Sequence, residues 1–303
     1  MNFILSFSEV TLNDQSWIRP IVCNSGTRSA DYSFVNIFAW REQYRQRVAN
    51  ADGCFVGQIE LNGRLLHTFP IGAADDAQAK AIIDAMAAQN CPLYLSGVSP
   101  AQLETLHRIY PNLTAEPQTD LFDYLYDAEK MSTFAGKKLH AKRNYVNRFI
   151  AANPDYVFEP ITHENLNDCR ITDGLWIYGK DDSEFDAIRG ELTALESCLA
   201  NFCELHADGG LIRLSPGGTV IAFAIGERVG ADTFVTHFEK ALTSIDGSYQ
   251  IINRDFTRCV LEKYPQIKYI NREDDMGLEN LRKAKRSYYP DLMEEKFLVT
   301  IAS

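Results

Sequence analysis

The chain has 303 residues, of which 46% are hydrophobic and 23% are charged, and its formal net charge at pH 7 is −11. These ordinary globular values disfavour a disordered or fibrous protein, and the length suits about two domains of roughly 100 to 200 residues each. The acidic excess argues against a protein that covers nucleic acid or anionic membrane with its whole surface, although it allows a local basic patch.

Signals for export, membrane insertion and metal binding are missing from the sequence. The first nine residues lack the basic flank and the long apolar core of a secretory signal. The longest apolar runs, such as residues 219–226, are far shorter than the roughly 20 residues of a membrane-spanning helix. The seven cysteines include no CxxC pair, and the six histidines show no ligand spacing. We therefore expect a soluble, cytoplasmic protein with buried thiols, no metal site and no integral membrane segment.

The first half of the chain alternates strand and helix signals. The dipeptide Asn62-Gly63 between two apolar runs is a strong hairpin signal, and Ser99-Pro100 is typical of a helix start. The predicted elements are a hairpin over 54–70, a helix over 74–90, a strand over 92–97, a helix from 100 to 110 and a strand over 123–127.

A long helix is predicted from residue 135 to residue 152, where Asn153-Pro154 ends it. A new strand follows over 156–160. This stop is the natural boundary between two nearly equal parts of the chain, so we predict domains over 1–152 and 153–303.

The second half begins with helices and continues with an antiparallel sheet. A hairpin is predicted around the turn Pro216-Gly217-Gly218. The predicted elements are a helix over 186–203, a hairpin over 210–226, a strand over 233–238, a helix over 247–263, a strand over 267–271, a helix over 278–287 and a strand over 296–301. This succession is the one expected of an acyltransferase of the GNAT type, and the first half looks like a looser copy of it.

A dense polar turn separates the strand over 267–271 from the basic helix that follows. Asn271, Arg272, Glu273, Asp274 and Asp275 precede Gly277, at a strand end where α/β sheets hold ligands. The alternative is an acidic first turn that complements the helix dipole.

A second candidate is the predicted helix over 135–152, which has no acidic residue although the protein is acidic. Lys138, Lys142 and Tyr145 fall on one side of it, and Arg143 adds a further charge. Such a cluster fits a phosphate or a nucleic-acid backbone. The alternative is a solvated face whose cations pair with the partner domain.

Three further candidates lie at the end of the strand over 233–238. Glu239 and Lys240 follow this strand directly, and His237 lies one position inside it. Histidine is a suitable general base near neutral pH. A surface ion pair for Glu239 and Lys240, and a packed core histidine, are the alternatives.

Four motifs resemble a known family. They are Tyr32-Ser-Phe-Val-Asn-Ile-Phe-Ala-Trp-Arg41, the segment 138–149, His237-Phe-Glu-Lys240 and the segment 271–285. The sequence is similar to a bacterial family of uncharacterised proteins related to the C-terminal domain of phosphatidylglycerol lysyltransferase. The resemblance implies two tandem GNAT-like domains of mixed, mostly antiparallel sheets flanked by helices, as in Fem-type aminoacyltransferases. It also implies transfer of an aminoacyl group from charged tRNA.

Two features of the sequence depart from the family pattern and narrow the expected donor and acceptor. The membrane-spanning half of true lysyltransferases is missing, which disfavours a lipid acceptor. The segment Ser244-Ile-Asp-Gly-Ser-Tyr249 shares only its glycine with the pyrophosphate loop of acetyl-CoA enzymes, which weakens acetyl-CoA as the donor.

The leading hypothesis is an acyltransferase that takes an aminoacyl group from aminoacyl-tRNA, or from another large anionic donor, to an amine or hydroxyl acceptor. The acceptor is a small molecule, a peptide or a lipid-like compound. The alternatives are an acetyl-CoA-dependent N-acetyltransferase and a non-catalytic binding protein on the same scaffold. The expected roles are donor binding by Lys138, Lys142, Arg143, Lys240 and Arg272, catalysis by Glu239, Glu273 or His237, and cleft lining or structural support by Asn271, Gly277 and Trp40.

Overall fold

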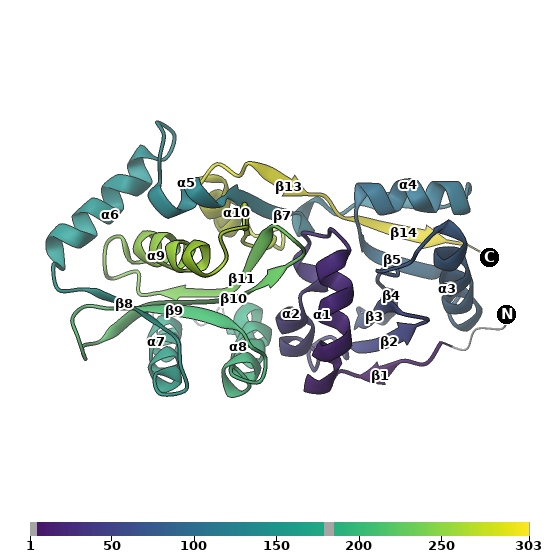
Figure 1. Cartoon of the computed structure of the whole chain (residues 1–303), viewed down its shortest axis with the longest axis horizontal. Coiled ribbons are helices and arrows are strands. Elements are labelled where there is room, and N and C mark those ends of the chain that lie inside the picture. Colours follow the sequence, from purple (N-terminus) through teal and green to yellow (C-terminus); the bar gives the residue numbers. More distant parts are fainter. Residues whose placement is uncertain (1–4, 179–184, 303) are drawn as a thin grey trace.

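Two seven-stranded mixed sheets lie side by side along the long axis of the molecule (Figure 1), in a computed structural model that describes residues 5–178 and 185–302. The first sheet has the order β1 (Ser8–Glu9), β2 (Arg47–Ala51), β3 (Cys54–Leu61), β4 (Arg64–His67), β5 (Leu93–Val98), β14 (Phe297–Ile301), β6 (Thr114–Pro117). The second has the order β13 (Leu292–Glu294), β7 (Asp123–Asp127), β12 (Tyr269–Asn271), β11 (Thr233–Ala241), β10 (Val220–Val229), β9 (Asp208–Arg213), β8 (Val157–Pro160).

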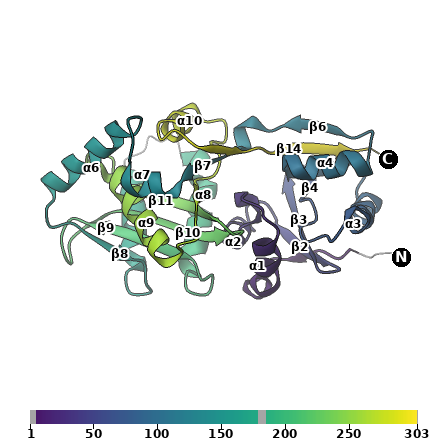
Figure 2. The same ribbon diagram turned by 45° about the horizontal axis from the view of Figure 1, so that its top comes forward.

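Helices cover the sheets, as Figures 1 and 2 show from two directions. The helices of the first half are α1 (Gln15–Asn24), α2 (Phe34–Ala39), α3 (Asp76–Gln89) and α4 (Pro100–Ile109). On one face of the second sheet lie α5 (Ala128–Thr133), α6 (His140–Ala152) and α9 (Ser248–Lys263), with α10 (Glu279–Arg286) nearby. On the other face lie α7 (Leu166–Tyr178) and α8 (Phe185–Ala200). Short 3-10 turns are η1 (Leu12–Asp14), η2 (Ala30–Tyr32) and η3 (Thr119–Leu121).

Each half of the chain contributes one of its strands to the sheet of the other half. β7 pairs with β12 and β13 in the second sheet, whereas the last strand, β14, pairs with β5 and β6 in the first. Strands therefore cross the boundary predicted at residues 152 and 153 in both directions. That boundary remains a proposal about how the chain divides.

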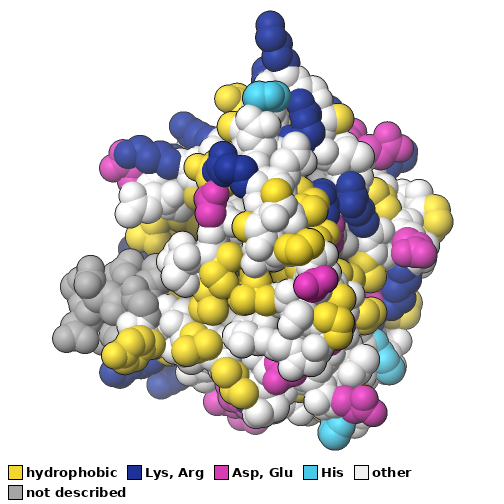
Figure 3. All heavy atoms as spheres, turned by 90° about the vertical axis from the view of Figure 1, so that its left-hand side faces the viewer, with side chains coloured by type: hydrophobic (Ala, Val, Ile, Leu, Met, Phe, Trp, Pro, Cys, Tyr) yellow, Lys and Arg dark blue, Asp and Glu magenta, His cyan; other side chains and the backbone are white. Residues whose placement is uncertain are grey.

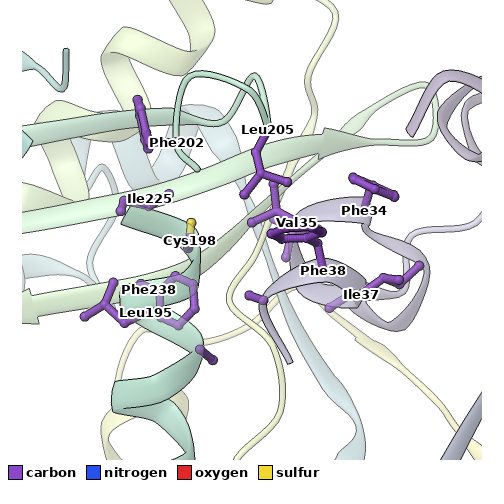
Figure 4. Packing of buried hydrophobic residues seen from close by; sticks show 14 of the residues in the cluster. Phe34, Val35, Ile37, Phe38, Leu195, Cys198, Phe202, Leu205, Ile225 and Phe238 are labelled. Carbon is purple, nitrogen blue, oxygen red and sulfur yellow. The ribbon is translucent and has the colours of Figure 1, made fainter. Parts of the chain in front are cut away.

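A hydrophobic cluster joins the two halves. Val35 and Phe38 of α2 pack with Leu195 and Cys198 of α8 and with Phe238 of β11, as Figure 4 shows. All five side chains are almost fully buried, and each buried side chain of this size stabilises the fold by roughly 1.5–3 kcal/mol. This cluster holds the first half against the face of the second sheet that carries α8.

Local signals in the sequence are confirmed where the contacts are local. Leu61 pairs with Arg64 across the predicted Asn62-Gly63 turn, where both turn residues have the left-handed φ that such a turn needs. Ser99 caps α4 and accepts a hydrogen bond from the backbone N–H of Gln102.

Several predicted elements have different bounds, and two of these differences change where candidate residues lie. The helix predicted from residue 135 begins at His140, because Phe134 and Gly136 have left-handed φ values of 50° and 91° that end α5 and delay the next helix. The strand predicted over 233–238 continues to Ala241, since its last residues still pair with β10. Glu239 and Lys240 therefore lie inside the strand and not beyond its end.

None of the helices in the described part of the chain is long and apolar enough to span a membrane.

Candidate functional site

The candidate site lies where one of two parallel strands of the second sheet ends and its neighbour continues. β11 pairs with β12 at three positions, the last of them Val235 with Asn271. β12 then ends, whereas β11 continues to Ala241. We call the region between residues 236–241 and residues 272–275, where the two strands are no longer paired, the strand opening.

A β-bulge in β11 marks the start of the strand opening. Ile225 of β10 pairs with Phe238, but the next residue, Gly226, pairs with Thr236, so His237 has no partner opposite. Bulges commonly re-aim a side chain beside an active site. A Cβ atom on Gly226 would lie 2.1 Å from the carbonyl oxygen of Val235, so the bulge depends on glycine at this position.

His237 is held between two polar partners on the α8 side of the sheet. Its Nδ1 lies 2.7 Å from Oε1 of Glu273, and its Nε2 lies 2.8 Å from Oγ of Ser33. The side chain of His237 is 2% exposed, whereas that of Glu273 is 26% exposed. Two of the three predicted catalytic residues, His237 and Glu273, are thus in direct contact, and Glu273 is the one that reaches solvent.

Ser33 is a site residue that the sequence analysis did not predict. It precedes α2 within the motif 32–41 and accepts a hydrogen bond from the backbone N–H of Asn36. Its only sequence signal is that of a helix cap, because its partner His237 lies 204 positions away.

Asn271 fixes the backbone that carries Glu273. The Nδ2 of Asn271 donates to the carbonyl oxygen of Arg28 and to Oδ2 of Asp123, at 2.8 and 2.9 Å. Its Oδ1 accepts from the backbone N–H of Glu273 at 2.7 Å, and Glu273 has a left-handed φ of 57°. Non-glycine residues rarely adopt this conformation unless their surroundings enforce it. The predicted supporting role of Asn271 fits these contacts.

Asp274 follows Glu273 in the same turn. Burial raises the pKa of its carboxyl group to about 6, and the neighbouring cation Lys296 only partly opposes this effect. A carboxyl group that titrates near neutral pH is a candidate for proton transfer.

On the α9 side of the strand opening, Arg272 and Glu239 form an ion pair. Nη2 of Arg272 donates to Oε1 of Glu239 at 2.9 Å, and Nδ2 of Asn253 donates to the same oxygen at 2.7 Å. The guanidinium also lies 4.9 Å from the ring centroid of Tyr288. Within residues 5–178 and 185–302, the buried Nη1 of Arg272 has no hydrogen-bond partner. This free donor is suited to bind an oxygen atom of a ligand.

Lys142 joins this cationic side of the opening. Its Nζ donates to Oγ of Ser287 at 2.7 Å and lies 4.0 Å from the ring centroid of Tyr288. Burial lowers the pKa of the Lys142 ammonium to about 8, and the charge of Arg272 lowers it further. A bound anion would offset both effects.

The other predicted basic residues are not gathered at the same point. Lys138 lies in the exposed loop before α6, with its Nζ 5.6 Å from the ring centroid of Tyr289. Arg143 donates to the carbonyl oxygen of Phe134 at 2.7 Å and so ties α6 to the end of α5. Figure 3 shows Lys and Arg side chains gathered at the top of this end of the molecule.

Lys240 is on the opposite face of the sheet from Arg272. It is 1% exposed, pairs with Oε2 of Glu191 on α8 at 2.9 Å, and lies 3.5 Å from the ring centroid of Trp176. The structure therefore does not place Lys240 beside Arg272.

Trp40 and Gly277, predicted to line the cleft or to have a structural role, make local packing and turn contacts. The rings of Trp40 and Tyr44 stack with their centroids 5.6 Å apart. Trp40 also packs against α8, since a Cβ atom added to Gly190 would lie 3.3 Å from the Trp40 ring. Gly277 has a left-handed φ of 73°, and its N–H donates to Oδ1 of Asp275 at 2.9 Å. Both contacts are structural.

The N-terminus of α9, where an acetyl-CoA enzyme would hold its pyrophosphate, is covered by α6. A Cβ atom on Gly247 would lie 2.8 Å from the carbonyl oxygen of Tyr145. Arg148 of α6 pairs with Asp246 at 2.9 Å. The carboxylate and the covering helix make this an unfavourable place for a second anion.

Comparisons with known proteins agree with this architecture. A family model described as phosphatidylglycerol lysyltransferase, C-terminal, matches residues 24–300. The crystal structure of a conserved protein of unknown function from Bacteroides thetaiotaomicron is 32% identical, with a TM-score of 0.91 over 98% of this chain and 100% of that chain.

Two more distant structures share the fold. L-PGS from Bacillus licheniformis is 15% identical, with a TM-score of 0.60 over 86% of this chain and 90% of that chain. FemX is 10% identical, with a TM-score of 0.61 over 97% of this chain and 96% of that chain. Together with the two mixed sheets, these likenesses confirm the predicted α/β fold of mixed sheets flanked by helices.

A curated relative, an uncharacterized protein of Mycoplasmoides gallisepticum, is 24% identical over 216 residues. The match covers 69% of this chain and 65% of that protein, which is less than two thirds of its length.

Proposed function

This chain belongs to the family of phosphatidylglycerol lysyltransferase C-terminal domains, and from that membership we propose that it is an acyltransferase. In the proposed reaction an aminoacyl group passes from aminoacyl-tRNA, or another large anionic donor, to an amine or hydroxyl acceptor.

The observation that carries the proposal is the arrangement of charge on the two sides of the strand opening. On the α9 side, Nη2 of Arg272 pairs with Glu239 and the half-buried ammonium of Lys142 donates to Ser287. Nη1 of Arg272 is left as a donor without a partner in the described part of the chain. On the α8 side, Glu273 reaches solvent and is backed by His237. A carbonyl carbon in the opening would thus lie between donors for its oxygen and a proton acceptor for its attacking group.

Each side chain then has a defined part in the reaction. Arg272 donates to the carbonyl oxygen as negative charge develops there, and Glu273 accepts the proton of the acceptor. Glu239 keeps the guanidinium in place and is committed to that ion pair. Lys142 and the exposed Lys138 bind phosphates of the donor.

A large donor fits better than acetyl-CoA, because α6 and Asp246 occupy the end of α9 that a pyrophosphate would need. Lys240 has no part in donor binding in this proposal, since it is paired on the other face.

The first experiment compares melting temperatures with aminoacyl-tRNA, with acetyl-CoA and without a ligand, because a ligand that binds only the folded state raises the melting temperature. A rise with aminoacyl-tRNA alone supports the proposal. A rise with acetyl-CoA alone overturns it in favour of an N-acetyltransferase.

The second experiment measures transfer from radiolabelled aminoacyl-tRNA to a panel of amines. Replacing Arg272 by glutamine should lower the rate about 10²- to 10³-fold, as the loss of one oxyanion donor does elsewhere. The control is Arg170→Lys on α7, whose side chain pairs with Glu196 at the surface, and it should transfer at the wild-type rate. Binding without any product from the wild-type protein would favour a non-catalytic binding protein.

A further inference from the structure

Five side chains form a continuous hydrogen-bonded series through the interface of the two halves. Glu273 contacts His237, which contacts Ser33, at 2.7 and 2.8 Å. Ser33 donates to Oε1 of Glu227, and Arg19 pairs with Oε2 of the same carboxylate. We call this series the relay.

The two ends of the relay reach different spaces. Glu273 is at the strand opening and is 26% exposed. Ser33, Glu227 and Arg19 line a cavity of about 450 Å³ between α1 and the end of β10. His237 and Ser33 connect Glu273 to this cavity, and their side chains are buried: Ser33 is 1% exposed and the side chain of His237 is 2% exposed. The relay is therefore a polar path through a buried interface.

The directions of the hydrogen bonds follow from the chemistry of the groups. The Glu227 carboxylate only accepts hydrogen bonds, and it already accepts from the backbone N–H of Val35 at 2.5 Å. The hydroxyl proton of Ser33 therefore points to Glu227, so Oγ of Ser33 must accept from the Nε2–H of His237. The same direction argues against Ser33 as a nucleophile, because its proton does not point to His237.

These hydrogen-bond directions allow a proton to move from Glu273 toward Glu227. One proton lies between Oε1 of Glu273 and Nδ1 of His237, because a carboxylate oxygen and a bare ring nitrogen would otherwise be two acceptors in contact. When the other oxygen of Glu273 takes a proton from the acceptor, this shared proton stays on Nδ1, the ring releases its Nε2 proton to Ser33, and Ser33 releases its own proton to Glu227. Each transfer uses a hydrogen bond that already exists.

The proposed reaction needs such a path when the acceptor is an alkylamine. Alkylamines have pKa values near 10 in water, as for lysine at about 10.4, so the acceptor arrives as an ammonium ion. It must lose one proton before its nitrogen attacks the ester carbon. The N–C bond then forms, the C–O bond to the donor breaks, and a second N–H proton goes to the leaving oxygen. One proton per turnover is left on the enzyme.

We propose that Ser33 and Glu227 carry this proton from the Glu273–His237 pair to the cavity between α1 and β10. The inference rests on the proposed function, because it assumes transfer to an amine. Ser33 and Glu227 do not touch the substrates in this scheme, and they act through His237.

The first test compares two acceptors with aminoacyl-tRNA as the donor. Ethanolamine is mostly protonated at pH 7 and needs the relay, whereas hydroxylamine is mostly unprotonated and does not. Replacing Ser33 by alanine should slow transfer to ethanolamine about 10²-fold, at the lower end of what general acid–base catalysis contributes. Transfer to hydroxylamine should change less than about twofold. Equal losses with both acceptors would overturn the relay.

The second test needs no turnover. It measures by NMR how fast the ring N–H protons of ¹⁵N-labelled His237 exchange with water. The relay predicts slower exchange in Ser33→Ala and in Glu227→Gln, since the path to the cavity is cut. If these side chains only hold the interface together and transfer no proton, the ring N–H protons should exchange faster in both variants, because each substitution loosens the interface.

Two variants serve as controls. Ser33→Thr keeps a hydroxyl group, so the ring N–H protons of His237 should exchange at the wild-type rate in this variant. Ser29→Ala removes another buried serine that caps the neighbouring η2 turn and should leave exchange unchanged. A wild-type protein that transfers to no amine would refute the proposed function, and slower exchange in Ser33→Ala would still support the proton path.

Discussion

Nη2 of Arg272 donates to Oε1 of Glu239 over 2.9 Å, and both side chains are mostly buried in the strand opening. The carboxylate of Glu239 compensates the buried charge of the guanidinium, while Nη1 has no hydrogen-bond partner among the residues that the structure describes. The protein thus keeps a positioned, charged donor ready in a site with little water, where it interacts more strongly than at the surface.

Removing one member of this pair should destabilise the fold. Glu239→Ala leaves the buried charge of Arg272 without its partner, which typically costs about 3–5 kcal/mol. The double variant with Arg272→Met should recover part of this loss, because no charge remains. Urea unfolding of the wild type, both single variants and the double variant measures the coupling, and strictly additive losses would contradict it.

The ammonium of Lys142 should give a stability change at alkaline pH. Burial holds its pKa at about 8, below the 10.5 of an exposed lysine, so between these values the unfolded chain binds more protons than the folded one. Stability therefore rises through this contribution as pH increases from about 8 to 10.5. Below pH 8 the unfavourable contribution is fully present.

The matched variant is Lys142→Met, which should be more stable than the wild type at pH 7. Denaturant unfolding at several pH values should show that this difference shrinks above pH 8. A constant difference would show that the ammonium is not desolvated. Donor affinity of the wild type should also fall above pH 8, where Lys142 loses its charge.

The contribution of Asp274 to stability should change with pH in the opposite direction to that of Lys142. Its pKa is raised to about 6 by burial, so the folded state binds more protons than the unfolded state between about pH 4 and pH 6. Its contribution becomes less favourable as pH rises through this window and stays unfavourable above it. Asp274→Asn should therefore be more stable than the wild type at pH 7 and equally stable below pH 4, as measured by thermal unfolding. An advantage that persists below pH 4 would point to a cause other than ionisation.

The β-bulge at His237 should depend on Gly226. Gly226→Ala places a Cβ atom 2.1 Å from the carbonyl oxygen of Val235, so the backbone must shift, at a cost of about 3 kcal/mol or more.

The matched control for this substitution is Gly174→Ala in the middle of α7, where a Cβ atom meets nothing within 4 Å. It should be neutral or stabilise by up to about 1 kcal/mol, since alanine favours helix. Chemical denaturation of both variants separates the two effects. Equal stability would show that the bulge tolerates a side chain.

The sequence by itself determined the local elements and their order. Asn62-Gly63 specified a hairpin because both residues tolerate the required backbone angles. Ser99-Pro100 specified a helix start because the cap and its partner are three residues apart. It also indicated the polar turn 271–275, since five such residues after a strand are unusual. Each of these signals is complete within a few residues.

Only the tertiary structure decided which candidates share a site. Glu239 and Lys240 are neighbours in sequence, yet successive side chains of a strand point to opposite faces, so one meets Arg272 and the other meets Glu191. Lys142 and Arg143 are also neighbours in sequence, yet Lys142 donates to Ser287 whereas Arg143 donates to the carbonyl oxygen of Phe134 at the end of α5. Ser33 is beside His237 because α2 is packed against the second sheet. These pairings depend on contacts between distant parts of the chain, and a single sequence carries no local signal for them.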